Sequence, residues 1–536
     1  MPSWDHEVDV VVLGSGGAAL AGALTAAASD ASVAVYEKAA TVGGTTAVSG
    51  GVVWIPAHNR SPDGELPVED ALSYLRAQAF GSMDDALVDT FVRTGPAMLD
   101  FIEAHSSLRF EIATGFPDYK PELPGGRPGG GRSFSAAPFD LNRLGEWRTR
   151  ITAFPQDWSN VGFDAETRAR LYAGGDPNAD LCVAGTALIA GLLKGLLDAG
   201  VTPHTSARAE ELIAENGRIV GVRIDADGRQ LSVHARRGVI LGTGGFEWEP
   251  TLVNAFLRGP MHGAVSPPHN TGDGLRMVMA HGADLANMGE AWWVPIVQIP
   301  GDTIDGQQRS RSVRLERTRP RSIIVNRLGK RFVNEACDYN SMAGAFHYLD
   351  PREGYVNDPA WMVFDSQHLK RYGFLGVDPD GPVPDWFCES ADLEELATKT
   401  GIALDGLDRT IEAWNRHVSE GADPDFGRGS SAYDGYWGDE HATTPAGKTL
   451  GPVDTGPFYA VPVSVGAMGT KGGPRTDRDG RVLHVSGRPI PGLYAAGNAM
   501  GGVTGRAYGG AGGTIGPAMV FGYRAGYAAA TGESVD

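Results

Sequence analysis

The hydrophobic pattern near the start of the chain predicts a strand, a helix and a second strand in close succession. Residues 8–13 form an uninterrupted apolar run, which is typical of a strand buried on both faces of a parallel sheet. The alanine-rich stretch at 20–28 favours a helix, and residues 32–36 form another apolar strand. The chain therefore begins with a βαβ unit.

Further along the chain the pattern of apolar and polar positions predicts a helix, a set of short strands, an inserted domain and a C-terminal helix. Residues 185–199 have the spacing of an amphipathic helix. Residues 209–242 alternate as short strands, with turns predicted at Asn216-Gly217 and Asp227-Gly228. The C-terminal region is rich in Gly and Ala and ends in a helix predicted over 513–530. Between 288 and 445 the alternation fades while Trp, Pro, Asp and Tyr become dense, which predicts an inserted domain.

Composition and charge narrow the classes of function. Glycine accounts for 75 of the 536 residues, about twice the ordinary share, which indicates places where the backbone comes close to a ligand. The net charge of −19 argues against a nucleic-acid or anionic-membrane partner. The three cysteines are far apart and form no CxxC motif, so neither a disulfide framework nor a zinc site is expected. No transmembrane run or secretory signal is visible, and we expect a cytoplasmic protein.

The turn between the first strand and the first helix has the spacing of a dinucleotide-binding motif, Gly14-x-Gly16-x-x-Ala19. Gly14 makes the tight turn, Gly16 lets the backbone approach a pyrophosphate, and Ala19 lets the helix and strand pack closely. The pyrophosphate would lie at the N-terminus of the helix, where free N–H groups favour anions. Glu37 ends the second strand, where it would accept ribose hydroxyls and repel the 2′-phosphate of NADP. The βαβ unit alone leaves FAD and NAD open.

Two further glycine turns favour FAD. Residues 239–245 and 492–498 each have the pattern of a strand that runs into glycine. A dinucleotide domain built from both ends of the chain is the arrangement of enzymes that hold a long, two-part FAD. We therefore expect an α/β fold with a discontinuous Rossmann-like FAD-binding domain, formed by 1–287 and 446–536, and an inserted domain over 288–445.

The chain resembles the FAD-dependent 3-ketosteroid dehydrogenases, within the fumarate-reductase-like flavoprotein superfamily. The most specific element is Tyr508-x-x-x-Gly512-Gly-Thr-Ile-Gly-Pro517, which is similar to the 1-dehydrogenase group. The other matching elements are the Gly14 motif with Glu37, Gly43–Pro56, Thr243–Phe246, Thr271–Gly274, Gly329–Glu335 and Pro491–Asn498. The resemblance implies that the insert over 288–445 is an α+β catalytic domain, and that the active site lies between the two domains, over the flavin ring. The reaction it implies is 1,2-desaturation of the A ring of an apolar 3-oxosteroid, with an external acceptor that reoxidises the flavin.

The resemblance also assigns roles to four residues. Tyr508 and the backbone N–H of Gly512 match the pair that holds the C3 carbonyl oxygen. Tyr339 matches the tyrosinate that removes a proton from C2 while hydride leaves C1 for flavin N5. Tyr119 matches the supporting tyrosine. Because a free tyrosine has a pKa of about 10, the site must lower the pKa of the base, and we expect the hydroxyl of Tyr119 to do so by donating to Tyr339.

The residues that we expect to contact FAD lie in the glycine-rich turns and their flanks. They are Gly14, Ser15, Gly16, Ala18, Ala19, Glu37, Lys38, Gly43, Gly44, Thr45, Thr46, Ser49, Gly50, Gly51, Ala207, Thr243, Gly244, Gly274, Gly497, Asn498, Gly513, Thr514 and Ile515. We expect no metal, because the histidines show no spacing typical of ligands. Five aromatic residues either line a substrate pocket or belong to the core: Trp292, Trp293, Trp361, Trp386 and Phe387.

Two departures from the family pattern leave the substrate open. Arg506 stands where a His or a neutral residue is expected, and an Arg would suit a carboxylate. Lys471 stands where the 1-dehydrogenases are expected to have Cys. The alternatives are an ene reductase that acts on a small unsaturated acid with Arg506 as its clamp, a 4,5-desaturating ketosteroid dehydrogenase, and a flavin module that only carries electrons. The sequence leaves the oligomeric state open.

Overall fold

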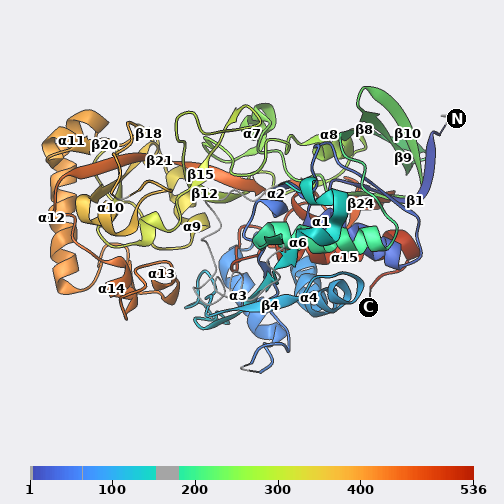
Figure 1. Cartoon of the computed structure of the whole chain (residues 1–536), viewed down its shortest axis with the longest axis horizontal. Coiled ribbons are helices and arrows are strands. Elements are labelled where there is room, and N and C mark those ends of the chain that lie inside the picture. The colour runs from blue at the N-terminus through green and yellow to red at the C-terminus, as the bar shows by residue number, and fades with distance from the viewer. Residues whose placement is uncertain (1–3, 63, 153–179, 379, 536) are drawn as a thin grey trace.

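The computed structural model describes residues 4–62, 64–152, 180–378 and 380–535. These residues form two regions, each organised around its own sheet, and both termini lie in the same region, at the right of Figure 1. Among the described residues, no helix has the length and apolar character needed to cross a bilayer.

The first sheet contains the predicted βαβ unit. Its strands β1 (His6–Leu13), β2 (Val33–Tyr36), β10 (Arg229–Leu241) and β24 (Pro489–Ala495) lie side by side in the order β2-β1-β10-β24, all parallel, and β23 (Arg481–Leu483) pairs antiparallel at the edge. The apolar residues Val10–Leu13 are fully buried, as expected for a central parallel strand. β24 comes from the C-terminal part of the chain, so one sheet unites both ends of the sequence.

Helices from the two ends of the chain cover this sheet together. α1 (Gly17–Ala28) packs against α15 (Ile515–Thr531), and α6 (Ala184–Asp198) lies beside α1. At the crossing a Cβ on Gly22 would lie 3.0 Å from the carbonyl oxygen of Gly522, so the two backbones are in direct contact. Only small residues allow this approach, which accounts for the Gly/Ala-rich character of both segments.

The hairpins predicted over 209–242 are present as β8 (Ala207–Glu215), β9 (Arg218–Ala226) and β10. Both turns form where predicted: Asn216-Gly217 and Asp227-Gly228 have positive φ at both residues, the geometry of tight type I′ hairpins. The glycine-rich segment 41–51 contains the short helix α2 (Gly44–Ala47).

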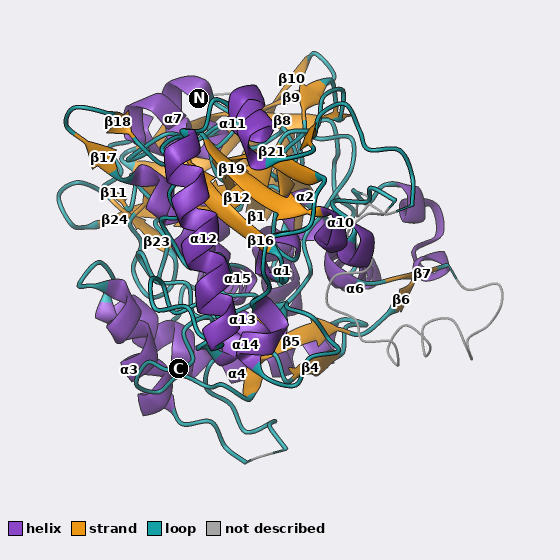
Figure 2. Cartoon of the chain, turned by 90° about the vertical axis from the view of Figure 1, so that its left-hand side faces the viewer, coloured by secondary structure: helices purple, strands orange, loops and turns teal. Residues whose placement is uncertain are grey.

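The second sheet has the order β15-β12-β21-β19-β16, with β20 also paired to β21. Its members are β12 (Ala291–Val297), β15 (Arg311–Ser312), β16 (Ser322–Asn326), β19 (Ala360–Asp365), β20 (Cys388–Ser390) and β21 (Phe458–Thr470). β21 pairs with both β12 and β19, which extends this sheet past residue 445, where composition predicts the insert to end. Helices α11 (Leu393–Thr400) and α12 (Leu404–Glu420) pack on this sheet through Leu396, Leu407 and Trp414 (Figure 2).

The remaining elements are distributed over the two regions. On the side of the first region they are β3 (Val53–Trp54), α3 (Val68–Ala79), α4 (Asp85–His105), β4 (Phe110–Thr114), β5 (Gly130–Ala136), β6 (Phe139–Asp140), β7 (Leu181–Cys182), α7 (Pro250–Phe256), α8 (Asp273–Ala280), β11 (Leu285–Ala286) and β22 (Gly473–Pro474). On the side of the second they are β13 (Thr303–Ile304), β14 (Gln307–Gln308), α9 (Tyr339–Gly344), β17 (Leu349–Asp350), β18 (Gly354–Tyr355), α10 (Ser366–Tyr372), α13 (Ala432–Tyr436) and α14 (Pro445–Thr449).

Candidate active site

A continuous cavity runs from the turn after β1 to the junction of the two regions. One end, which we call the glycine end, is lined by residues 14–18, Glu37, Thr243 and Gly497. The other, the tyrosine end, is lined by Tyr119, Tyr339 and Tyr508. Residues from the beginning, middle and end of the chain therefore share one cavity.

At the glycine end the backbone makes the approach that the motif predicts. Gly14 has φ of 102°, and a Cβ there would lie 2.4 Å from the carbonyl oxygen of Gly242, so only glycine fits without displacing the neighbouring chain. α1 begins after Gly16 with no side chain capping its N-terminus. Its first N–H groups can therefore donate hydrogen bonds to an anion in the cavity. The N–H of Gly17 already donates to Thr46 Oγ1 at 3.1 Å.

Glu37 is held in place at the end of β2. Its Oε2 accepts from Ser15 Oγ at 2.6 Å, and its Oε1 accepts from the backbone N–H of Ala39 at 2.8 Å. Ser15 Oγ in turn accepts from the N–H of Gly43 at 2.9 Å. A carboxylate fixed at the end of the second strand beside an uncapped helix N-terminus fits the ribose and pyrophosphate of a dinucleotide.

Most of the residues predicted to contact FAD line this cavity, and four do not: Ala19, Gly43, Gly274 and Gly513. Ala19 packs against Gly242, the helix–strand contact expected of it. Gly274 lies against Thr243, and Gly513 lies against the ring of Tyr508, so close packing explains these two glycines. Lys38 lines the cavity, where its Nζ bonds Thr271 and Asp273, both at 2.7 Å.

At the tyrosine end three phenols form a hydrogen-bonded chain. The hydroxyls of Tyr119 and Tyr339 are 2.7 Å apart, and Tyr339 donates to the hydroxyl of Tyr508 at 2.8 Å. Thr514 Oγ1 also donates to the Tyr508 hydroxyl, at 3.2 Å. The structure thus brings together three residues that are up to 389 positions apart in the sequence, as the resemblance implies.

Local hydrogen bonds fix the positions of Tyr339 and Tyr119. Tyr339 is the first residue of α9, whose N-cap Asp338 accepts from the N–H of Ser341 at 2.9 Å. The N–H of Tyr119 donates to the carbonyl oxygen of Gly509 at 3.0 Å, which ties it to the Tyr508 loop. The residue before it, Asp118, makes a buried 2.6 Å ion pair with Arg132. Sequence reasoning missed this pair, because no motif joins its two members.

The peptide between Ala511 and Gly512 is also fixed in orientation. Its carbonyl oxygen, on Ala511, accepts from Ser133 Oγ at 2.9 Å. In a trans peptide the N–H points opposite to the C=O, so the Gly512 N–H is directed away from Ser133, and Gly512 lines the cavity. Among the described residues, no acceptor takes this N–H.

Burial is the largest influence on the pKa values of the three tyrosines. It raises the pKa of Tyr119, Tyr339 and Tyr508, because a phenolate loses its hydration there. For Tyr339 the hydrogen bond with Tyr119 acts in the other direction and lowers the pKa. The expected contribution of Tyr119 is therefore present, but it is outweighed by burial, and the pKa of Tyr339 lies well above its ordinary value.

Neither departure from the family pattern reaches the cavity. Arg506 is 55% exposed, lies outside the cavity lining, and pairs through Nε with Glu290 Oε1 at 2.9 Å. Lys471 is buried, and its Nζ donates to the carbonyl oxygens of Gly505 and Ala507 at 3.0 and 3.1 Å. The same Nζ lies 3.9 Å from the centre of the Trp292 ring. Burial lowers the pKa of Lys471 to about 7.

The five aromatic residues singled out in the sequence do not line the cavity. Trp292 packs edge-on against Tyr508, with ring centres 4.7 Å apart, and the other four belong to or pack against the cores of the second region. The lining includes three side chains of the cluster around the phenols, namely Phe116, Trp437 and Met468, and two guanidinium groups, those of Arg309 and Arg314. Their positions carry no local motif, so the sequence alone could not single them out.

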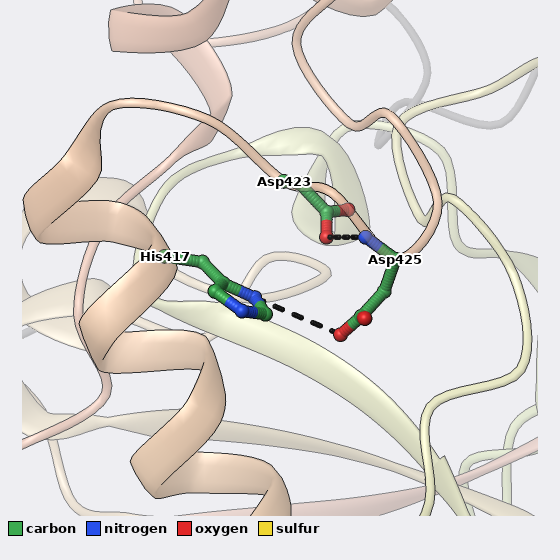
Figure 3. Close-up of side chains that lie close together, drawn as sticks. All are labelled: His417, Asp423 and Asp425. Atoms are coloured by element: carbon green, nitrogen blue, oxygen red, sulfur yellow. Dashed lines mark hydrogen bonds and ion pairs between the residues drawn. The ribbon is translucent and has the colours of Figure 1, made fainter.

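Within the described part of the chain, one group of side chains has the spacing of metal ligands, namely His417, Asp423 and Asp425 (Figure 3). Its chemistry is already accounted for by charge pairing: both carboxylate oxygens of Asp423 accept from Arg331, at 3.0 and 2.9 Å, and His417 faces Asp425 at 3.6 Å. Arg331 also pairs with Glu335, so Asp423 belongs to a buried ion network of the second region. We assign no metal to it.

Comparison with known proteins identifies the family. The sequence model of a protein family described as "FAD binding domain" matches residues 9–515 of this chain. The chain belongs to this FAD-binding flavoprotein family. It is 41% identical to 4-oxocyclohexanecarboxylate 2-dehydrogenase of Sinomonas cyclohexanicum, over 97% of this chain and 92% of the relative. It is 40% identical to 3-oxosteroid 1-dehydrogenase of Mycolicibacterium smegmatis, over 97% and 96% of the two chains.

Solved structures agree with these relatives. The structure of 3-ketosteroid delta1-dehydrogenase from Sterolibacterium denitrificans, in complex with 1,4-androstadiene-3,17-dione, superimposes with a TM-score of 0.90 at 34% identity and covers 98% of this chain and 100% of that one. The flavoprotein is thus a FAD-dependent oxidoreductase of the ketosteroid-dehydrogenase kind, and its cofactor is FAD. The expected α/β fold, the family and the cofactor are confirmed.

Proposed function

We propose that this flavoprotein introduces a double bond next to the carbonyl group of a ring ketone. The observation that carries the proposal is the chain of three buried phenols beside the Gly512 N–H, all lining the cavity that continues to the glycine end. Removal of a proton next to a carbonyl requires a base on one side and hydrogen-bond donors to the oxygen on the other. A protein that only carries electrons needs neither.

The roles of the residues follow from their positions. The Tyr508 hydroxyl and the Gly512 N–H hold the carbonyl oxygen and stabilise the negative charge that develops on it as the α-proton leaves. Tyr339, as phenolate, takes this proton, and Tyr119 donates a hydrogen bond to the phenolate. The residues of the glycine end would hold FAD, and the bound cofactor would supply the acceptor for the hydride of the β-carbon. The ketone loses one proton and one hydride and becomes the α,β-unsaturated ketone.

For a 3-oxosteroid this chemistry is the 1,2-desaturation of the A ring, with C2 as the α-carbon and C1 as the β-carbon. Relatives with the name 3-oxosteroid 1-dehydrogenase at 38–40% identity support this substrate. A second candidate is a small ring ketone with a carboxylate, such as 4-oxocyclohexanecarboxylate. It is favoured by the two guanidinium groups in the lining, Arg309 and Arg314, and by the name of the 41% identical relative.

The ene-reductase alternative loses its main support, because its clamp Arg506 lies outside the cavity and pairs with Glu290. The 4,5-desaturation of a steroid remains an outcome for product analysis.

The experiment is anaerobic bleaching of the oxidised holoenzyme. The flavin absorbance is followed while androstenedione or 4-oxocyclohexanecarboxylate is added, and the product is identified by mass spectrometry and NMR. We expect bleaching and one new conjugated double bond next to the carbonyl. Failure of every cyclic ketone to bleach the flavin, together with oxidation of the reduced enzyme by fumarate, would contradict the proposal.

A further inference from the structure

The loop that contains Tyr508 and Gly512 rests on strands β3 and β5, which hold its peptide groups by hydrogen bonds. The two strands are antiparallel, and Trp54 of β3 pairs with Ser133 of β5. Ser133 Oγ donates to the carbonyl oxygen of Ala511 at 2.9 Å. The N–H of Trp54 donates to the carbonyl oxygen of Gly512 at 3.2 Å. Two paired residues therefore fix the peptide groups on both sides of Gly512.

The ring of Trp54 limits the space of the same loop. A Cβ on Gly509 would lie 2.4 Å from Cη2 of this ring, and a Cβ on Gly510 would lie 2.6 Å from its Nε1. A Cβ on Gly512 would lie 2.5 Å from the carbonyl oxygen of Val52. The loop backbone is in direct contact with the chain beneath it, so close packing sets its path.

A buried ion pair fixes the surface on which the loop lies. Arg132 Nη1 donates to Asp118 Oδ2 at 2.6 Å, and the two side chains are 1% and 2% exposed. Asp118 Oδ1 accepts from Trp54 Nε1 at 3.1 Å. Arg132 directly precedes Ser133, and Asp118 directly precedes Tyr119. The same pair therefore anchors the serine that bonds the loop and the tyrosine next to the proposed base.

We infer that Ser133 is a positioning residue that directs the Gly512 N–H at the carbonyl oxygen of the substrate. Ser133 does not line the cavity, so it acts through the peptide whose carbonyl oxygen, on Ala511, accepts from its hydroxyl. The N–H of this peptide has no acceptor among the described residues. A donor stabilises a developing oxyanion most when it already points to the position of that oxygen. The inference rests on the proposed desaturation and adds the residue that aligns one of its two oxygen donors.

Loss of the Ser133 hydroxyl should affect the reaction more than the binding of the ketone. Without it the peptide before Gly512 can rotate, and its N–H then points less accurately at the oxygen. A neutral carbonyl oxygen loses little by this, whereas an enolate oxygen loses a hydrogen bond to a charged group, which is the stronger kind. The base is unchanged, so the rate should fall by the same factor at every pH.

The test compares Ser133→Ala and Ser133→Thr with the matched control Ser322→Ala. Ser322 is 1% exposed, its Oγ donates to the carbonyl oxygen of Arg319 at 3.0 Å, and it does not line the cavity. Stopped-flow reduction of the FAD-loaded enzyme by androstenedione or 4-oxocyclohexanecarboxylate, at several pH values, gives the limiting rate and the ketone Kd. Calorimetric titration with 3,4,5-trifluorophenol, which mimics the enolate when ionised, gives a Kd without turnover, and fluorine NMR reports its ionisation. Flavin content and thermal unfolding verify that each variant is folded.

For Ser133→Ala we expect the limiting rate to fall by roughly 10- to 100-fold, less than the roughly 100- to 1,000-fold effect of removing an oxyanion donor outright. The ketone Kd should stay within about threefold, and the Kd of the ionised phenol should rise by about tenfold. Ser133→Thr keeps the hydroxyl and should recover most of the rate. Ser322→Ala should behave as wild type.

Two results would overturn the inference while leaving the proposed desaturation in place. One is a Ser133→Ala variant whose flavin is reduced at the wild-type rate. The other is a variant that weakens the binding of FAD, ketone and phenolate alike, or that shifts the pH profile, because the serine would then act through the fold or through the tyrosines. If neither ketone reduces the flavin of the wild type, both the proposed function and the inference fail.

Discussion

The two ends of the cavity are built on different principles. The glycine end relies on backbone groups, namely the turn at Gly14 and the uncapped N-terminus of α1, together with the fixed carboxylate of Glu37. The tyrosine end uses side chains, and Tyr119, Tyr339 and Tyr508 come from three distant segments. Backbone recognition needs only a short motif between two elements, whereas a side-chain cluster exists only after the whole chain has folded. The two ends should therefore respond to mutation in different ways.

The largest effect is expected from Gly14→Ala, at the glycine end. The new methyl group would lie 2.4 Å from the carbonyl oxygen of Gly242, and φ of 102° is unfavourable for alanine. The turn must then open, and we expect the purified variant to contain little or no FAD and no activity. The measurement is the ratio of flavin to protein absorbance after gel filtration.

Gly200→Ala is the matched control. Gly200 also has positive φ, at 78°, but nothing lies within 4 Å of the added Cβ, so this variant carries the backbone strain without the collision. It should retain a full complement of FAD. Equal loss of flavin in both variants would show that backbone strain, and not the close approach at Gly14, limits cofactor binding.

The contrast between the ends also explains what could be predicted from the sequence. The Gly14 motif, Glu37 and the turn at Thr243 are local patterns with fixed spacing, so the cofactor, the fold and most of the lining at the glycine end were predictable. The trio of tyrosines was accessible only through the family resemblance, because no spacing connects residues 119 and 339. Arg314 was missed, and Arg506 attracted attention instead, because proximity to Tyr508 in sequence says nothing about which guanidinium enters the cavity.

The second-largest effect is expected from a substitution at the tyrosine end. Tyr339→Phe removes the proposed base while keeping the ring that packs against Tyr119 and Tyr508. We expect the rate of flavin reduction to fall by roughly 100- to 10,000-fold, the usual contribution of a general base, with FAD content and substrate Kd nearly unchanged. Stopped-flow reduction under anaerobic conditions gives the rate.

Tyr433→Phe is the control for this variant. Tyr433 is a buried tyrosine of the same aromatic cluster, but it does not line the cavity. A rate within a few-fold of wild type is expected. Should Tyr433→Phe and Tyr339→Phe lose the same activity, the cluster would matter through packing, and the assignment of Tyr339 as base would be wrong.

A smaller effect distinguishes Tyr119 from Tyr339. Burial raises the pKa of Tyr339, so at neutral pH the reactive phenolate is the minor form, and kcat/KM should rise with pH through neutrality and above. The hydrogen bond with Tyr119 lowers this pKa, so Tyr119→Phe should move the profile to higher pH and reduce the rate at a fixed neutral pH by about tenfold. Rates measured from pH 6 to 10 test this. A profile that is lower in rate but unshifted in pH would contradict the role of Tyr119.

The smallest effect is expected for the pH dependence of stability and involves Lys471. This lysine donates hydrogen bonds to the carbonyl oxygens of Gly505 and Ala507, in the loop that leads to Tyr508. Burial lowers the pKa of Lys471 to about 7 from its ordinary value of 10.5. Between these values the unfolded chain binds a proton that the folded chain has released, so the free energy of unfolding contributed by this group increases with pH. The difference in unfolding free energy between wild type and Lys471→Met should therefore change in favour of the wild type by about 1 kcal/mol per pH unit above pH 7.

Urea unfolding of the holoenzyme with excess FAD at pH 7, 8 and 9 measures this change. Lys399→Met is the control, because Lys399 is an exposed lysine paired with Glu395 on the surface of α11, and its removal should leave the pH dependence unaltered. The quantity compared is the change of the unfolding free energy with pH, so the constant effect of the packing change that methionine introduces cancels. Parallel pH dependences for wild type and Lys471→Met would mean that the lysine keeps its proton in the folded state, held by the two carbonyl oxygens and the face of Trp292. The tyrosine end would then rest on a permanent buried charge, unlike the glycine end, where Glu37 accepts from the Ser15 hydroxyl and Lys38 pairs with Asp273.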